Sequence, residues 1–181
     1  MNRIDPLDPE SATGVVGTLL EAVEKKLGMV PNLTRGLAHS PAALDGYLSL
    51  MGALAKGALT PRQREQIALA VAEANQCDYC LSAHSAIGGR LGLDEAEIRR
   101  NRRAESADQR TSAVLRLARR VVDTRGDVSD HDLQGARSAG LEDGEIVEVV
   151  AHVALNVFTN YFNRLARTEI DFPVVRADKA A

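Results

Sequence analysis

The chain has 181 residues, of which 45% are apolar and 26% are charged, and its net charge is −3 at pH 7. This length suits one domain with a sizeable hydrophobic core, and the lack of a long basic tract argues against nucleic-acid binding. No apolar stretch approaches the roughly 18–20 residues of a membrane-spanning helix, so we also expect no membrane partner.

Helical signals recur along the whole chain, whereas strand-like alternation is hard to find. Thr60, Pro61 and Gln63 have the order of an N-cap, a first helical residue and the glutamine of a capping box. Gly28 and Gly92 fall where helices would stop. The predicted helices span residues 11–27, 32–38, 41–56, 61–75, 78–91, 94–101, 106–124, 130–139 and 142–168.

These elements predict an all-α fold, a single helical domain over residues 1–181. Aromatic residues make up 3% of the chain and tryptophan is absent, so the core has to be built from Leu, Val, Ile and Ala, which suit close-packed helices. We expect the core to lie within about residues 30–172 and the tail, residues 173–181, to be loose.

The only two cysteines, Cys77 and Cys80, form a C-x-x-C motif, and His84 follows four residues later. Positions three and four apart share a helix face, so these three side chains project as one cluster. A break near residues 75 and 76 would start a new helix at the motif and direct free N–H groups toward a thiolate. His84 is then the base for Cys80, and Glu65 on the preceding helix orients the imidazole, as in covalent catalysis.

The spacing Glu65-x11-Cys77-x2-Cys80-x3-His84 resembles the active-site signature of the alkylhydroperoxidase D-like family, within the carboxymuconolactone decarboxylase superfamily. The segments at 39–41, 59–65, 75–84 and 160–164 are also similar to its peroxidase-related members, and the resemblance covers about residues 30–172. One position departs from the pattern: Tyr79 stands where some members carry a histidine, so the relay lacks one proton carrier.

This resemblance implies a helical, alkylhydroperoxidase-like oxidoreductase that reduces small alkyl hydroperoxides. Cys80 matches the peroxidatic cysteine, Cys77 the resolving cysteine, and Glu65 and His84 the proton relay. An external dithiol, supplied in some relatives by a lipoyl-type adaptor, then reduces the disulfide. The family also implies a homo-oligomer, and the mechanism requires no haem, flavin or other cofactor.

Four other interpretations stay open. In the first, the cysteines are inert buried thiols. In the second, they form a Cys-Cys-His zinc site completed by Glu65, although structural zinc normally takes four ligands, often from two C-x-x-C pairs. A carboxymuconolactone-type decarboxylase shares the fold, but its enolate-like chemistry needs no paired thiols. A redox-sensing or disulfide-exchange protein would use the same pair without turning over peroxide.

The remaining polar signals are weaker. His152 lies in an apolar run and is typical of a satisfied core histidine, and Asn156, Asn160 and Asn163 follow one helix face as an interhelical polar seam or a subunit contact. The first residues lack the apolar region of a signal peptide, and two cysteines without an export signal suit a reducing cytosol. We therefore expect a cytoplasmic protein.

Overall fold

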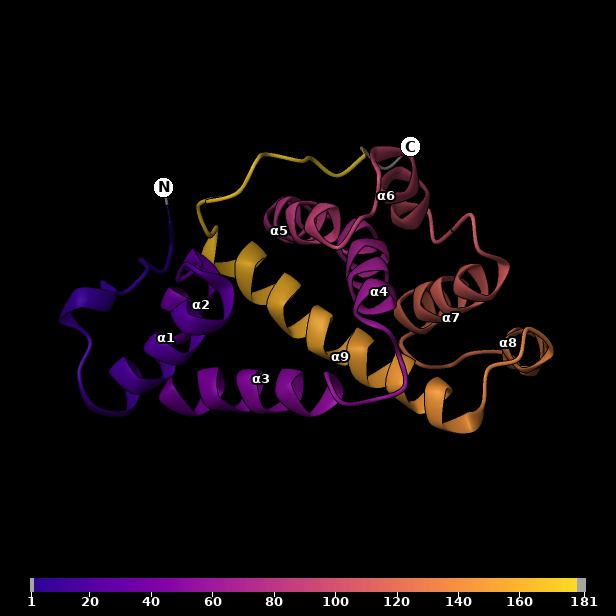
Figure 1. Cartoon of the computed structure of the whole chain (residues 1–181), viewed down its shortest axis with the longest axis horizontal. Helices are drawn as coiled ribbons and strands as arrows, with labels where there is room; N and C mark the ends of the chain where they lie inside the picture. Colours follow the sequence, from indigo (N-terminus) through magenta and orange to yellow (C-terminus); the bar gives the residue numbers. More distant parts are fainter. Residues whose placement is uncertain (1, 179–181) are drawn as a thin grey trace.

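The computed structural model describes residues 2–178, and every regular element in that range is helical, which confirms the predicted all-α fold (Figure 1). A short 3-10 helix, Pro9–Ser11, precedes the α-helices. These are α1 (Gly14–Leu27), α2 (Asn32–Leu37), α3 (Pro41–Leu54), α4 (Pro61–Ala74), α5 (Asp78–Arg90), α6 (Glu95–Arg102), α7 (Gln109–Thr124), α8 (Asp130–Ser138) and α9 (Asp143–Ala166).

Helix α4 is the centre of the bundle. It packs against α5, α6, α7 and α9, and its residues from Gln66 to Glu73 are all buried. This run is rich in Ala, Ile, Leu and Val, so the helix is apolar nearly all round, as expected of a helix surrounded by others. Helix α9 is the longest α-helix among the described residues, runs diagonally through the middle of the view in Figure 1, and contacts α2, α3, α4, α5 and α7.

Local sequence sets the start of α4 and of α5. The Thr60 hydroxyl accepts a hydrogen bond from the Gln63 N–H, and the Gln63 amide oxygen accepts one from the Thr60 N–H, so the predicted capping box is confirmed. After α4 the chain turns at Asn75 and Gln76, where Gln76 takes a left-handed φ of 53°. This turn makes Cys77 the N-cap of α5, as the sequence predicted.

The C-terminal segment, residues 170–178, differs from the loose tail that we expected. Its side chains at Ile170, Phe172 and Val175 pack against the buried cluster that contains both cysteines. Its backbone is also bonded, since the Val175 N–H donates to the Ser82 hydroxyl (2.9 Å) and the Ala177 N–H to the Asp78 carboxylate (2.8 Å). Polar side chains of α5 thus accept hydrogen bonds from the backbone of a segment whose own sequence has no helical pattern. The rest of the predicted tail, residues 179–181, lies outside the described residues.

Helix α9 presents a row of exposed apolar side chains, which we call the α9 stripe. Its members lie three to eight residues apart, at Val147, Val150, Phe158, Tyr161 and Leu165. Such a row on one helix face is typical of a contact surface, and the predicted homo-oligomer stays a prediction. None of the helices within residues 2–178 combines the length and hydrophobicity that a bilayer crossing demands.

Candidate active site

The two cysteines lie side by side at the start of α5. Their Sγ atoms are 2.7 Å apart, both thiols are free, and both residues are buried. The Cys77 thiol donates to the Cys80 sulfur, while the Cys80 N–H points back to the Cys77 sulfur at 3.4 Å. The pair is therefore polarised, with Cys77 as the donor and Cys80 as the acceptor.

This arrangement separates the acidities of the two thiols. Burial alone would raise the pKa of Cys80, but the hydrogen bonds that its sulfur receives, first from Cys77 and then from Asn163 on α9, lower the pKa below its ordinary value. The pKa of Cys77 is raised, because its thiol proton is held by Cys80 and because the residue is buried. The first thiolate to form is therefore that of Cys80.

Helix α9 contributes to this effect from the far end of the sequence. The Asn163 amide donates to the Cys80 sulfur at 3.3 Å, and Asn160 and Thr159 also lower the pKa of the thiol. Asn160 is itself held in place, because its amide oxygen accepts a hydrogen bond from Asn75 at 3.0 Å. The sequence suggested that the asparagines of α9 form an interhelical polar seam or a subunit contact. Asn160 and Asn163 do form an interhelical seam, which ends on the Cys80 sulfur, whereas Asn156 bonds to the His152 carbonyl of its own helix.

His84 and Glu65 form the second half of the site. The imidazole Nδ1 lies 2.7 Å from the Glu65 carboxylate, and both side chains are about four-fifths buried, with 22% and 18% exposed. Burial would lower the pKa of His84, but the carboxylate outweighs it and raises the pKa above its ordinary value. Since Nδ1 is bonded to Glu65, the other nitrogen, Nε2, is left to face a reactant.

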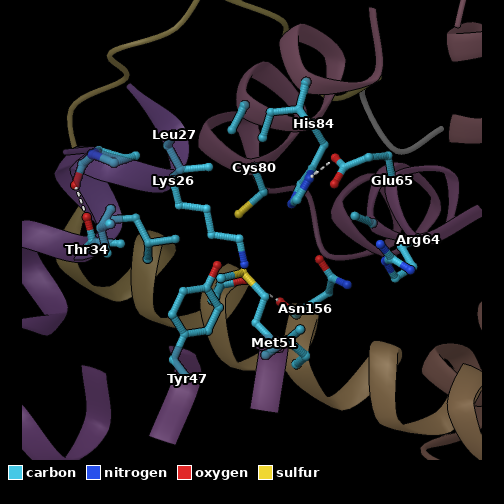
Figure 2. Close-up of a pocket in the computed structure, with 18 of the residues that line it drawn as sticks. Lys26, Leu27, Thr34, Tyr47, Met51, Arg64, Glu65, Cys80, His84 and Asn156 are labelled. Atoms are coloured by element: carbon cyan, nitrogen blue, oxygen red, sulfur yellow. Dashed lines mark hydrogen bonds and ion pairs between the residues drawn. The ribbon is translucent and has the colours of Figure 1, made fainter. Parts of the chain in front are cut away.

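Three of the four predicted residues line one cavity of about 430 Å³. Cys80, His84 and Glu65 line it, whereas Cys77 lies behind Cys80 and does not. In Figure 2 the Cys80 sulfur points into the open space, with the His84–Glu65 pair beside it on one wall. A molecule in the cavity can therefore reach Cys80 directly and Cys77 only through it.

Two tyrosines near the site play different parts. Tyr47 on α3 lines the cavity, and burial, then the nearby Glu65 and Cys80, raise its pKa, so its phenol stays protonated as a donor. No motif around Tyr47 indicated this role. Tyr79 faces away: its hydroxyl accepts the Leu33 N–H at 3.1 Å, and its ring meets Phe172 edge-on at 5.9 Å between centroids. Tyr79 thus joins α5 to α2 and the C-terminal segment.

His152 differs from the satisfied core histidine that its sequence context suggested. It is 4% exposed and lines the cavity, but its buried Nε2 has no hydrogen-bond partner among the described residues. Burial lowers its pKa, so the ring is neutral at pH 7.

Within residues 2–178, no three His, Cys, Asp or Glu side chains are arranged to hold a metal ion, so the zinc interpretation finds no ligand set there.

Comparison with known proteins finds one family model and a distant curated relative. The model of the carboxymuconolactone decarboxylase family matches residues 41–124. An alkyl hydroperoxide reductase of Mycobacterium tuberculosis is 28% identical over 86 residues, which are 47% of this chain and only a quarter of that protein.

Two solved structures share the fold over most of their length. One, from Ralstonia eutropha JMP134, is described as an alkylhydroperoxidase AhpD core and uncharacterized peroxidase-related protein; it is 26% identical, with a TM-score of 0.82 over 94% of this chain and 92% of that one. An uncharacterized peroxidase-related protein from Silicibacter sp. TM1040 is 24% identical, with a TM-score of 0.79 over 92% of both chains.

Proposed function

We propose that the protein is a thiol-dependent peroxidase for small alkyl hydroperoxides, since residues 41–124 match the model of the carboxymuconolactone decarboxylase family and the fold is similar to that of an alkylhydroperoxidase AhpD core. The observation that carries the proposal is the asymmetry of the cysteine pair. Cys80 faces the cavity with a lowered pKa, and Cys77 stands behind it as a protonated donor. That is the arrangement which a nucleophilic thiolate and its resolving thiol require.

In the first step, the Cys80 thiolate attacks the terminal oxygen of a hydroperoxide. A sulfur–oxygen bond forms, the O–O bond breaks, and Cys80 becomes a sulfenic acid while the peroxide is reduced to an alcohol. The departing alkoxide takes a proton from His84, whose Nδ1 is held by Glu65 so that Nε2 faces the cavity. The raised pKa of His84 keeps that proton available near neutral pH.

In the second step, Cys77 attacks the sulfenic sulfur of Cys80. A disulfide forms and water leaves, with the hydroxyl of the sulfenic acid taking up the thiol proton. The 2.7 Å between the two sulfur atoms means that this step needs no large movement of the helix. An external dithiol, such as a lipoyl-type adaptor, then reduces the disulfide by exchange and is itself oxidised to a disulfide.

Two other functions remain as alternatives of different kinds. A decarboxylase would be consistent with the family model, but it gives no role to a sulfur–sulfur hydrogen bond or a lowered thiol pKa. A redox sensor would use the same pair, but it has no need of a cavity of about 430 Å³ beside the thiolate.

The test is thiol titration and mass spectrometry before and after one equivalent of cumene hydroperoxide. If the protein is a peroxidase, both thiols of the wild type should be lost because they form an intramolecular disulfide. Cys77→Ser should then hold a trapped sulfenic acid on Cys80, and Cys80→Ser should not react. Several turnovers with excess dithiol separate a peroxidase from a sensor, which would be oxidised once per chain. Thiols that survive peroxide would reject the proposal, and lactone turnover retained in Cys80→Ser would favour the decarboxylase.

A further inference from the structure

The cavity beside Cys80 has an unusual charge balance for this protein. Most of its walls are apolar, contributed by side chains such as Val23, Leu27, Ile87 and Leu155. The charged residues that line it share one sign, apart from one carboxylate: they are Lys26, Arg64, Arg90 and Glu65. The whole chain, in contrast, carries a net charge of −3.

The single carboxylate is not free to balance the cations. Glu65 is bonded to His84 at 2.7 Å, and its charge serves that imidazole. No carboxylate in the described part of the chain lies within 4 Å of the charged nitrogens of Lys26, Arg64 or Arg90, while most other buried or half-buried acids have an ion-pair or hydrogen-bond partner. A concave site lined by unpaired charges of one sign concentrates ligands of the opposite sign.

The cations differ in what they can do. Arg64 on α4 is half-buried and donates to the Leu59 carbonyl at 2.7 Å, so part of its guanidinium is already used. Lys26 on α1 and Arg90 on α5 are exposed and make no hydrogen bond to another described side chain. Figure 2 shows Lys26 reaching from α1 into the cavity, toward Tyr47 and Met51, so its ammonium can meet a ligand there.

We propose that the cavity selects apolar molecules with an anionic head group, so that the preferred substrate is the hydroperoxide of an amphipathic carboxylic acid. This inference rests on the proposed peroxidase function. The hydroperoxide group lies at Cys80 and His84, the hydrocarbon chain contacts the apolar walls, and the carboxylate meets Lys26 and Arg90. A neutral hydroperoxide would fill the same apolar space but leave these cations without a partner.

The experiment compares linoleic acid hydroperoxide with its methyl ester in wild type, Lys26→Gln and Arg90→Gln, below the critical micelle concentration of the acid and the solubility limit of the ester. The matched control is Lys25→Gln, because Lys25 is the neighbouring lysine in the last turn of α1 and does not line the cavity. We expect wild type to prefer the acid, and each cavity variant to lower kcat/KM for the acid by about threefold to fivefold, the upper part of the range for exposed ion pairs. The ester should be unaffected, and the preference should shrink at high salt because exposed charges are screened.

Equal use of acid and ester by wild type, or equal losses in Lys26→Gln and Lys25→Gln, would overturn the inference while leaving the peroxidase intact. Calorimetric titration of wild type with dodecanoate and with dodecanol provides a reading that does not depend on turnover. If no hydroperoxide oxidises Cys80, the proposed function fails. In that case dodecanoate binding that is weakened in Lys26→Gln still supports the anionic ligand, and equal binding of acid and alcohol rejects it.

Discussion

Replacing Asn163 by leucine tests whether α9 activates the nucleophile. The Asn163 amide donates to the Cys80 sulfur at 3.3 Å from a fully enclosed position, with 4% of the residue exposed. A donor to a charged acceptor favours the charged form, so its removal raises the pKa of Cys80. Such a hydrogen bond is worth about 1.5–3 kcal/mol, and at this long distance, with other donors remaining, we take about 1.4 kcal/mol, or a tenfold loss of thiolate at a fixed pH below the pKa.

Two measurements as a function of pH report the thiolate: the rate of alkylation by iodoacetamide, and, separately, the thiolate absorbance at 240 nm. Because the chain has only two cysteines and the pKa of Cys77 is raised, the first thiolate that these methods detect is that of Cys80. Asn156→Leu is the matched control, since Asn156 is also buried on α9 but bonds to the His152 carbonyl and not to sulfur. If both variants shift the profile equally, α9 stabilises the fold and does not tune the thiolate.

Three further predictions follow from the contacts of the site. Glu65→Gln should lower the pKa of His84, measured by NMR titration, because the Glu65 carboxylate raises that pKa in the folded state. The free energy of unfolding that this variant loses is therefore greatest below pH about 6.5, and the loss shrinks as pH rises through the His84 pKa of the wild type. An unchanged pKa of His84 in the variant would contradict the claim that Glu65 raises it. Tyr79→Phe should lower the free energy of unfolding, measured in urea, by about 1 kcal/mol through the lost bond to the Leu33 N–H, and should leave kcat unchanged. A large fall in kcat would instead give Tyr79 a part in the reaction. Tyr161→Glu, in the α9 stripe and 61% exposed, should shift sedimentation toward monomer if the protein is the homo-oligomer we expect, and an unchanged profile would place the contact elsewhere.

The helices could be predicted from local sequence because their signals are local. Capping residues such as Thr60 mark starts, and glycines such as Gly28 and Gly92, which take positive φ in the structure, mark stops. The pairing of His84 with Glu65 was also predictable, since both lie on consecutive helices that flank one turn. For the same reason, the break at residues 75 and 76 could be placed before α5.

The rest depends on contacts between residues far apart in the chain. Asn163 is 83 positions from Cys80, and nothing in the spacing of the asparagines says which helix they meet. The C-terminal segment is ordered by Asp78 and Ser82, which lie on α5 and carry no sequence signal for a partner. His152 could be predicted to be buried, but not to border a cavity, because a cavity is a property of six packed helices and not of one.

The two cysteines of a C-x-x-C motif are alike in sequence, and the fold makes them different. Residues 41–124, which match the family model, contain Glu65, both cysteines and His84, the four residues to which we assign the proposed reaction. A further donor to the Cys80 sulfur besides Cys77, however, comes from Asn163 on α9, outside that region. A fragment that ended at residue 124 would keep the motif but lose this donor and one wall of the cavity. The chemistry of the motif therefore depends on the whole helical domain.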